Sequence, residues 1–306
     1  MNKNTVGYIY VLLAAFFFAL IAVIGKTVIN TGINVFDLLV LQNAAAVIFM
    51  LAYFAAVDIR KLRLSRSNLK TVLIQGFIGS SGTTILFYLA LEKLNAGTAS
   101  MLLFTHPVLV SIYFMATKTK KITQTSNLAL LAAFLGSTMV INVFNIDLSA
   151  TPLAGLIFGT ISSCAYAFYN IYADVKLKDF EPLVITFYTT LSITAAALLL
   201  HPGFFRFDFE ITSELLIYIC ELAVVSGILP IIFLYKGIKR VGADKASIVA
   251  TAELPITIVL SLFVLGERMG PVQLAGILLI MCSIIILQYE GLFEGILSKF
   301  RDKKLL

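Results

Sequence analysis

The chain has 306 residues, of which 59% are hydrophobic and 13% are charged, with a net charge of +6 and a mean hydropathy of +0.97. Soluble domains are nearer one half hydrophobic and one quarter charged, so this composition excludes an ordinary soluble enzyme or binding domain. The apolar residues form runs of about 20, the length of a helix that crosses a bilayer. We therefore predict an all-α polytopic membrane protein.

Ten such runs follow one another with short connections between them. They begin near Val6, Phe36, Lys70, Gly97, Ser126, Pro152, Glu181, Ser213, Asp244 and Pro271. The first run is too long for a secretory signal, and we take it as the first span. With a cytoplasmic N-terminus, 19 of the 23 Lys and Arg residues fall on the cytoplasmic side. This distribution predicts a multi-pass protein of the cytoplasmic membrane with both termini inside, and it leaves no basic surface for nucleic acid.

The second half of the chain repeats the first. A shift of 147 positions places Tyr88 on Tyr235, and a slip of one more residue places Pro107 on Pro255. We expect a first repeat over residues 1–148 and a second over residues 149–306, the latter with a short basic cytoplasmic tail. Because each repeat holds five spans, an odd number, the second repeat must cross in the opposite direction. Inverted repeats of this kind are typical of secondary transporters.

Three prolines predict departures from regular helix. Pro107 and Pro255 occupy matching points of spans four and nine, near the middle of the membrane. Proline removes a backbone donor, and free carbonyls at that depth need a protein or aqueous partner. Matched interruptions point to a central binding site, although each proline could also mark a simple packing kink. Pro230 is expected to end or kink span eight.

Two ionisable residues lie beside the matched prolines. Glu253 is the deepest carboxylate of the predicted spans, and His106 directly precedes Pro107 in the opposite half. Intramembrane ionisable groups are costly, so they are candidates for binding a substrate or a proton. A structural hydrogen bond between helices is the alternative for each of them. If the halves face each other, we expect His106 and Glu253 to approach one another and to share one proton.

Four further residues are weaker candidates for the substrate site. Glu221 could line an outer entrance or anchor span eight at the headgroups, and Lys26 could hold a substrate carboxylate or extend toward the headgroups. Tyr88 and Tyr235 are paired by the repeat, and their rings could lie beside a cation. Carboxylates together with tyrosines favour a substrate that bears an amine.

The second half also carries a family pattern. Its elements are Ala246-Ser247, Glu253-Leu254-Pro255, Leu265-Gly266-Glu267-Arg268 and Gln273-Leu274-Ala275-Gly276, with a small residue seven positions further on. This pattern resembles the EamA domain of the drug/metabolite transporter superfamily, and the likeness extends over the ten spans. The resemblance implies secondary transport of small metabolites, such as amino acids, organic cations or sugar phosphates, through a cavity between the halves. Proton-coupled export is the direction that it favours.

Three other functions remain as alternatives: a uniporter or channel, a non-transporting membrane scaffold and an intramembrane enzyme. The sequence holds no Gly-x-Ser-x-Gly, His-Glu-x-x-His or Walker A motif, so we expect no catalytic residues, no metal and no cofactor. The expected partners are a small-molecule substrate, protons as the coupling ion and the lipid bilayer. We expect a monomer or a homodimer that moves its substrate by alternating access.

Overall fold

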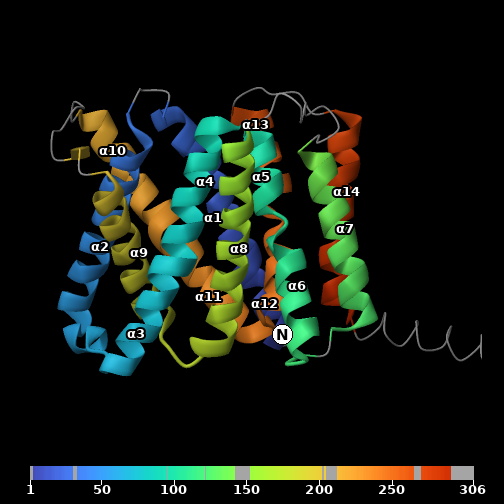
Figure 1. The fold of residues 1–306 in the computed structure, drawn as a ribbon, viewed down its shortest axis with the longest axis horizontal. Helices are drawn as coiled ribbons and strands as arrows, with labels where there is room; N and C mark the ends of the chain where they lie inside the picture. The colour runs from blue at the N-terminus through green and yellow to red at the C-terminus, as the bar shows by residue number, and fades with distance from the viewer. Residues whose placement is uncertain are drawn as a thin grey trace, which may run out of the picture.

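The computed structural model describes residues 3–29, 33–94, 96–120, 122–141, 152–201, 203–204, 212–264 and 270–290. Within these ranges every regular element is a helix, and most of the helices run roughly parallel to one another (Figure 1). Seven helical runs in the described part of the chain are long and apolar enough to cross a membrane. They correspond to seven of the ten predicted spans, and the count of ten stays a prediction.

The described part of the first half holds α1 (Lys3–Ile29), α2 (Val35–Val57), a short 3₁₀ turn (Ile59–Leu62), α3 (Arg66–Ile74), the π-helical segment η2 (Gln75–Ser81), α4 (Gly82–Lys93), α5 (Ala96–Leu103), α6 (His106–Thr117) and α7 (Gln124–Val140). The described part of the second half holds α8 (Leu153–Lys176), α9 (Pro182–Leu200), α10 (Ser213–Leu222), the π-helical segment η5 (Ala223–Ile228), α11 (Leu229–Val241), α12 (Ala243–Ala250), α13 (Glu253–Val264) and α14 (Pro271–Gln288).

Two long helical runs each contain a π-helical segment. The run α3–η2–α4 includes Gln75–Ser81, and the run α10–η5–α11 includes Ala223–Ile228. A shift of 147 positions places the first segment on residues 222–228, which overlap the second. In the first segment the Ser81 hydroxyl donates to the Gly76 carbonyl at 2.9 Å. Because π-helical turns are rare and frequent at functional sites, their recurrence at matching positions draws attention to these two runs.

The helices pair across the two halves of the chain. α1 packs against α11, α4 against α8 and α2 against α9, while α7 and α14 stand together at the right edge of Figure 1. Glycine allows the closest of these approaches. A Cβ on Gly136 would lie 2.8 Å from the Gly276 carbonyl oxygen, and one on Gly276 would lie 2.6 Å from the Gly136 oxygen. Any larger residue would separate α7 from α14.

The largest buried cluster joins α1, α6, α8, α11 and α12 at the centre of the bundle. Large apolar side chains are instead exposed on outward faces, for example Leu131 on α7 and Leu278 on α14. An apolar exterior around a core that holds many buried Ser, Thr and Asn side chains suits a bundle that is surrounded by lipid.

Candidate functional site

Two helical runs are interrupted at matching positions. α5 ends at Leu103 and α6 begins at His106, while α12 ends at Ala250 and α13 begins at Glu253. Pro107 and Pro255 are buried in the first turns of the second helices, where a missing backbone N–H breaks no helical hydrogen bond. The sequence predicted interruptions at these points. Each of these prolines therefore lies in a helix whose first residue, His106 or Glu253, was predicted for the site.

Pro230 has a similar local role. It is buried in the first turn of α11, directly after η5. It therefore begins a helix inside the run from Ser213 to Val241 and does not end that run.

His106 is completely buried at the start of α6. Its Nδ1 lies 3.0 Å from the Leu103 carbonyl oxygen. Because a carbonyl only accepts, Nδ1 carries the proton and Nε2 of the neutral ring is left as an acceptor. Nε2 has no hydrogen-bond partner among the described residues. The imidazole is thus fixed at one nitrogen and free at the other.

Glu253 is the first residue of α13 and is partly buried. Its backbone carbonyl accepts a hydrogen bond from the Thr257 hydroxyl at 2.9 Å. In the described part of the chain, its carboxylate makes no ion pair or hydrogen bond with another residue. The N-terminal end of a helix favours a negative charge, which offsets part of the cost of burying this carboxylate.

Tyr166 on α8 connects these two residues. Its ring centroid lies 4.2 Å from that of His106, and the Glu253 carboxylate lies within electrostatic range of its hydroxyl. The interrupted run of the first half therefore packs on an aromatic side chain that also lies within electrostatic range of the interrupted run of the second half. Tyr166 carries no charge and was not selected from the sequence. The available signal was its spacing of three residues from Tyr169, which places both rings on one face of α8.

Aromatic rings continue from Tyr166 toward α11. Its ring centroid lies 5.8 Å from that of Tyr169, which in turn stacks on Tyr235 at 5.3 Å. The Tyr235 hydroxyl accepts a hydrogen bond from Gln75 Nε2 at 3.0 Å. Tyr235 is thus brought close to the predicted site. Tyr88 packs instead with a small buried cluster of α2 and α9.

The two remaining candidates are not brought into this group. Glu221 lies exposed on α10, where its charge interacts with the Tyr218 hydroxyl. Lys26 belongs to α1, but its side chain lies outside the described residues. Among the described residues, no group of three His, Cys, Asp or Glu side chains could hold a metal ion.

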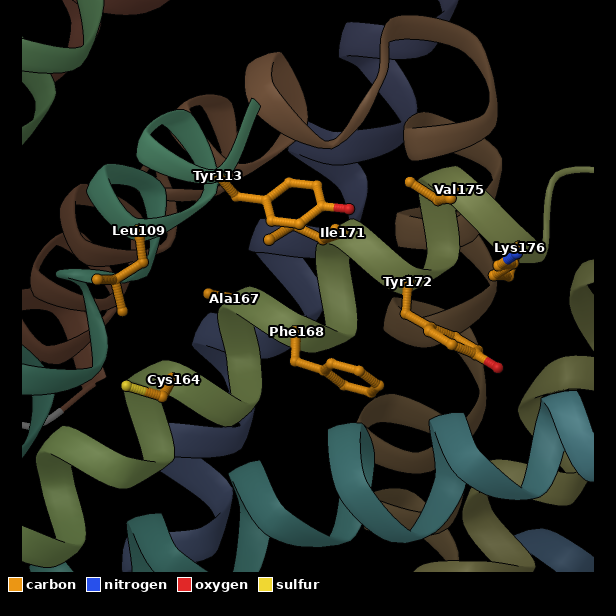
Figure 2. A pocket seen from close by; sticks show the side chains of 9 residues that line it. All are labelled: Leu109, Tyr113, Cys164, Ala167, Phe168, Ile171, Tyr172, Val175 and Lys176. Atoms are coloured by element: carbon orange, nitrogen blue, oxygen red, sulfur yellow. The ribbon is translucent and has the colours of Figure 1, made fainter. Parts of the chain in front are cut away.

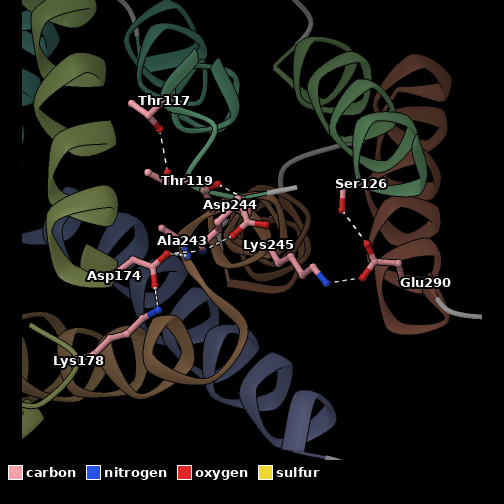
Figure 3. Close-up of polar contacts among 11 residues, drawn as sticks. Thr117, Thr119, Ser126, Asp174, Lys178, Ala243, Asp244, Lys245 and Glu290 are labelled. Atoms are coloured by element: carbon pink, nitrogen blue, oxygen red, sulfur yellow. Dashed lines mark hydrogen bonds and ion pairs between the residues drawn. The ribbon is translucent and has the colours of Figure 1, made fainter. Parts of the chain in front are cut away.

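A network of ion pairs joins the two halves at the end of the bundle that carries the start of α1 (Figures 1 and 3). Lys120, in the connection between α6 and α7, pairs with Asp174 on α8 and with Asp244 on α12, the latter at 2.6 Å. Asp174 also pairs with Lys178 at 2.6 Å and accepts from the Ala243 N–H at 3.1 Å. Burial alone would lower the pKa of Lys120, but the charge of Asp244 and the hydrogen bonds to both carboxylates hold that pKa above its ordinary value.

A second part of this network ties the residues just after α14 to both halves. Glu290 pairs with Lys245 on α12 and accepts hydrogen bonds from the hydroxyls of Thr123, at 2.5 Å, and Ser126, at 3.1 Å. Burial alone would raise the pKa of Glu290, but these hydrogen bonds, with that from Lys245 the strongest, hold it below its ordinary value. The network therefore links the α6–α7 connection, α7, α8, α12 and the residues that follow α14.

A groove between α6 and α8 lies apart from His106 and Glu253. It has a volume of about 380 Å³ and is lined mainly by apolar side chains, with Tyr113, Tyr172 and Lys176 along it (Figure 2). None of the residues predicted for the substrate site lines this groove. Its apolar lining suits contact with lipid better than binding of a polar metabolite.

Paired helices with interrupted runs, and buried ionisable groups at the interruptions, are features of polytopic membrane transporters. The sequence pattern of the EamA-like transporter family matches residues 5–142 and again residues 153–289. The chain belongs to this family of transporters. The match confirms the resemblance that the sequence of the second half suggested, and it indicates a transporter and not an enzyme.

Several relatives have transporter names. The chain is 25% identical to the uncharacterized inner membrane transporter YicL of Salmonella typhimurium over 229 residues, which cover 74% of this chain and 75% of the relative. It is 25% identical to the uncharacterized transporter YcbK of Bacillus subtilis, over 69% of each chain. One solved crystal structure has a TM-score of 0.78 and 13% identity, and the match covers 92% of this chain and 96% of that one. At this identity, the likeness to that structure shows the fold alone.

Proposed function

We propose that the chain is built from two inverted repeats of five spans each, residues 1–148 and 149–306. Equivalent glycines support this arrangement. A Cβ on Gly7 of α1 would lie 2.9 Å from the Cβ of Arg240, and a Cβ on Gly155 of α8 would lie 2.9 Å from the Cβ of Lys93. A shift of 147 or 148 positions converts one of these contacts into the other. Reciprocal contacts of this kind are expected of a pseudo-twofold axis in the membrane plane.

We further propose that the protein is a secondary transporter of the cytoplasmic membrane, with both termini inside. It moves a small polar metabolite that bears an amine, an amino acid or a related compound, by alternating access, and it couples export to proton entry. One observation carries the proposal: His106 and Glu253 begin α6 and α13 at matching interruptions, and Tyr166 packs on His106 within electrostatic range of Glu253.

The coupling follows from competition for one carboxylate. Glu253 has no fixed partner in the described part of the chain, so either a proton or a substrate ammonium can neutralise it. Neutralisation of Glu253 by either the proton or the ammonium favours the alternating-access movement, because an unpaired charge inside a membrane protein is costly. Protons that enter would then exchange for ammonium groups that leave. His106 Nε2, a free acceptor beside Tyr166, provides a second position for the proton.

Transport into liposomes tests this proposal. A thermal-shift screen of the purified protein against amino acids, amines and sugar phosphates first selects the substrate, because a ligand that binds the native state raises its stability. We then expect accumulation of that substrate against its gradient when a pH gradient is imposed. Glu253→Gln should lose the pH dependence. Glu221→Gln, the same change at an exposed carboxylate, should keep it.

The same assay separates the alternatives. A uniporter or channel would equilibrate the substrate, but the pH gradient would not concentrate it. A scaffold would give no flux with any compound. Unchanged pH dependence in the Glu253→Gln variant would overturn the proposed coupling.

A further inference from the structure

Two buried amide side chains beside the aromatic rings carry oxygens without partners. Gln75 in η2 is 0% exposed and Asn170 on α8 is 1% exposed. Neither Gln75 Oε1 nor Asn170 Oδ1 has a hydrogen-bond partner in the described part of the chain. Buried acceptors are almost always paired, because leaving one without a donor is unfavourable. Gln75 contacts Tyr169, which directly precedes Asn170, and two such oxygens on these neighbouring residues call for a donor that is not part of the protein.

The orientation of the Gln75 amide is fixed by its neighbours. Nε2 donates to the Tyr169 carbonyl oxygen at 3.1 Å and to the Tyr235 hydroxyl at 3.0 Å. A carbonyl can only accept, so exchanging the amide nitrogen and oxygen would set two acceptors against each other. Gly79 lies beside the free oxygen, and a Cβ there would come within 3.4 Å of Gln75 Oε1. The same Cβ would lie 3.2 Å from the Cα and Cβ of Tyr169, so the glycine lets η2 approach α8 closely beside this acceptor.

Asn170 is fixed in the same way. Its Nδ2 donates to the Tyr166 carbonyl oxygen at 2.8 Å, one helical turn back, so its Oδ1 is also an acceptor. Asn170 directly follows Tyr169, whose carbonyl holds Gln75. The positions equivalent to Gln75 and Asn170 in the other half of the chain are Leu222 and Ala22, both apolar. The two amides are therefore particular to one half and do not belong to the repeated pattern.

We propose that Gln75 and Asn170 recognise the N–H groups of a primary or secondary ammonium ion on the substrate. This rests on the proposed transport function and assigns the substrate amine a set of neutral acceptors in addition to Glu253. The rings of Tyr169 and Tyr235 stack on one another at 5.3 Å and so present little open face to a cation. A quaternary ammonium, which has no N–H and depends on open ring faces, is therefore a poor ligand.

Stepwise methylation of the amine tests this recognition. The full chain in detergent is titrated with ethanolamine, N-methylethanolamine, N,N-dimethylethanolamine and choline, and in parallel with glycine, N-methylglycine and N,N,N-trimethylglycine. The rise of the unfolding midpoint with concentration gives each apparent affinity. We expect affinity to fall with each methyl group, and the quaternary compounds to bind roughly tenfold to a hundredfold more weakly than the primary ones. Equal or tighter binding of the quaternary compounds overturns the inference, as does a protein that neither series stabilises.

Three variants tie the result to these residues. Asn170→Leu removes the free oxygen at nearly constant size, so we expect the preference for N–H groups to shrink while the fold keeps its stability. Asn170→Asp loses the hydrogen bond to the Tyr166 carbonyl but keeps an acceptor oxygen, so it should retain the preference. Asn43→Leu is the matched control, because Asn43 on α2 is 4% exposed and donates to the Leu39 carbonyl at 2.8 Å in the same way. An Asn170→Leu variant that discriminates as well as the Asn43→Leu control contradicts the assignment.

The two proposals fail in different ways. The transport proposal fails when Glu253→Gln leaves pH-dependent transport unchanged. The assignment of Gln75 and Asn170 fails when methylation of the amine does not weaken binding, whatever the liposome experiment shows.

Discussion

Replacing Lys120 with Met should destabilise the protein, because Lys120 holds two carboxylates from the other half of the chain. The side chains of Asp174 and Asp244 are 1% and 10% exposed, so neither can turn fully to water when its partner is lost. Removing one member of a buried ion pair typically costs ~3–5 kcal/mol. Lys120 itself is 27% exposed, and Asp174 keeps Lys178 and the Ala243 N–H. We therefore expect a loss of about 3 kcal/mol, the lower end of that range.

The matched control is Lys178→Met, which removes a lysine from the same carboxylate. Lys178 is 46% exposed and pairs with Asp174 within one short segment, so its contribution should be only about 0.5 kcal/mol. The chain has no Trp, so far-ultraviolet circular dichroism during heating is the suitable measurement. At ~2 °C per kcal/mol for a chain of this size, the midpoint should fall by roughly 6 °C for Lys120→Met and by about 1 °C for Lys178→Met. Equal falls of the midpoint in the two variants would refute the reasoning, because they would show that the ion pairs between the halves add nothing to stability.

Three further predictions concern packing, backbone conformation and pH. Gly136→Val should destabilise the protein by about 2 kcal/mol through overpacking against Gly276, measured by the same heating experiment, whereas Leu131→Val on the exposed face of α7 should have little effect. Gly242→Ala should lower the unfolding midpoint, because Gly242 has a φ of 86° and a Cβ there would lie 2.4 Å from Lys120 Nζ. An unchanged midpoint would show that the backbone tolerates a side chain at this position. The folded-state pKa of Glu290 lies below its ordinary value of 4.5. Its stabilising contribution is therefore complete above pH 4.5 and is lost as the pH falls through the folded-state pKa. On acidification, the unfolding midpoint of Glu290→Gln should fall less than that of the unchanged protein.

The sequence allowed the helical class and the interruptions to be predicted, because both depend on local chemistry. Long apolar runs have few alternatives to helix in a membrane. Pro107 and Pro255 each exclude a backbone hydrogen bond at a known position, and the helices do begin again there. The family pattern around Glu253 was specific enough to identify the family, which the match over both halves confirmed.

The connections among distant residues could not be predicted in the same way. Lys120 and Asp174 are 54 positions apart, and the positive-inside rule treats such lysines only as signals of orientation. Tyr166 has no charge, and its importance depends on contact with His106 from another helix. The π-helical segment at Gln75 contains no proline, and its position follows from packing against α8 and α9. Each of these features is decided by tertiary contacts that a reading of local pattern does not contain.

The reciprocal pairing of helices has a consequence for synthesis of the chain. α1 packs against α11, which ends at Val241, so the first helix is inserted long before its partner has been made. At ~5–20 residues per second, the delay is roughly 10 to 40 s. During that interval the small-residue face around Gly7 must be covered by lipid or by the insertion machinery. The two halves, expressed as separate chains, would each leave such faces uncovered until they met in the same bilayer.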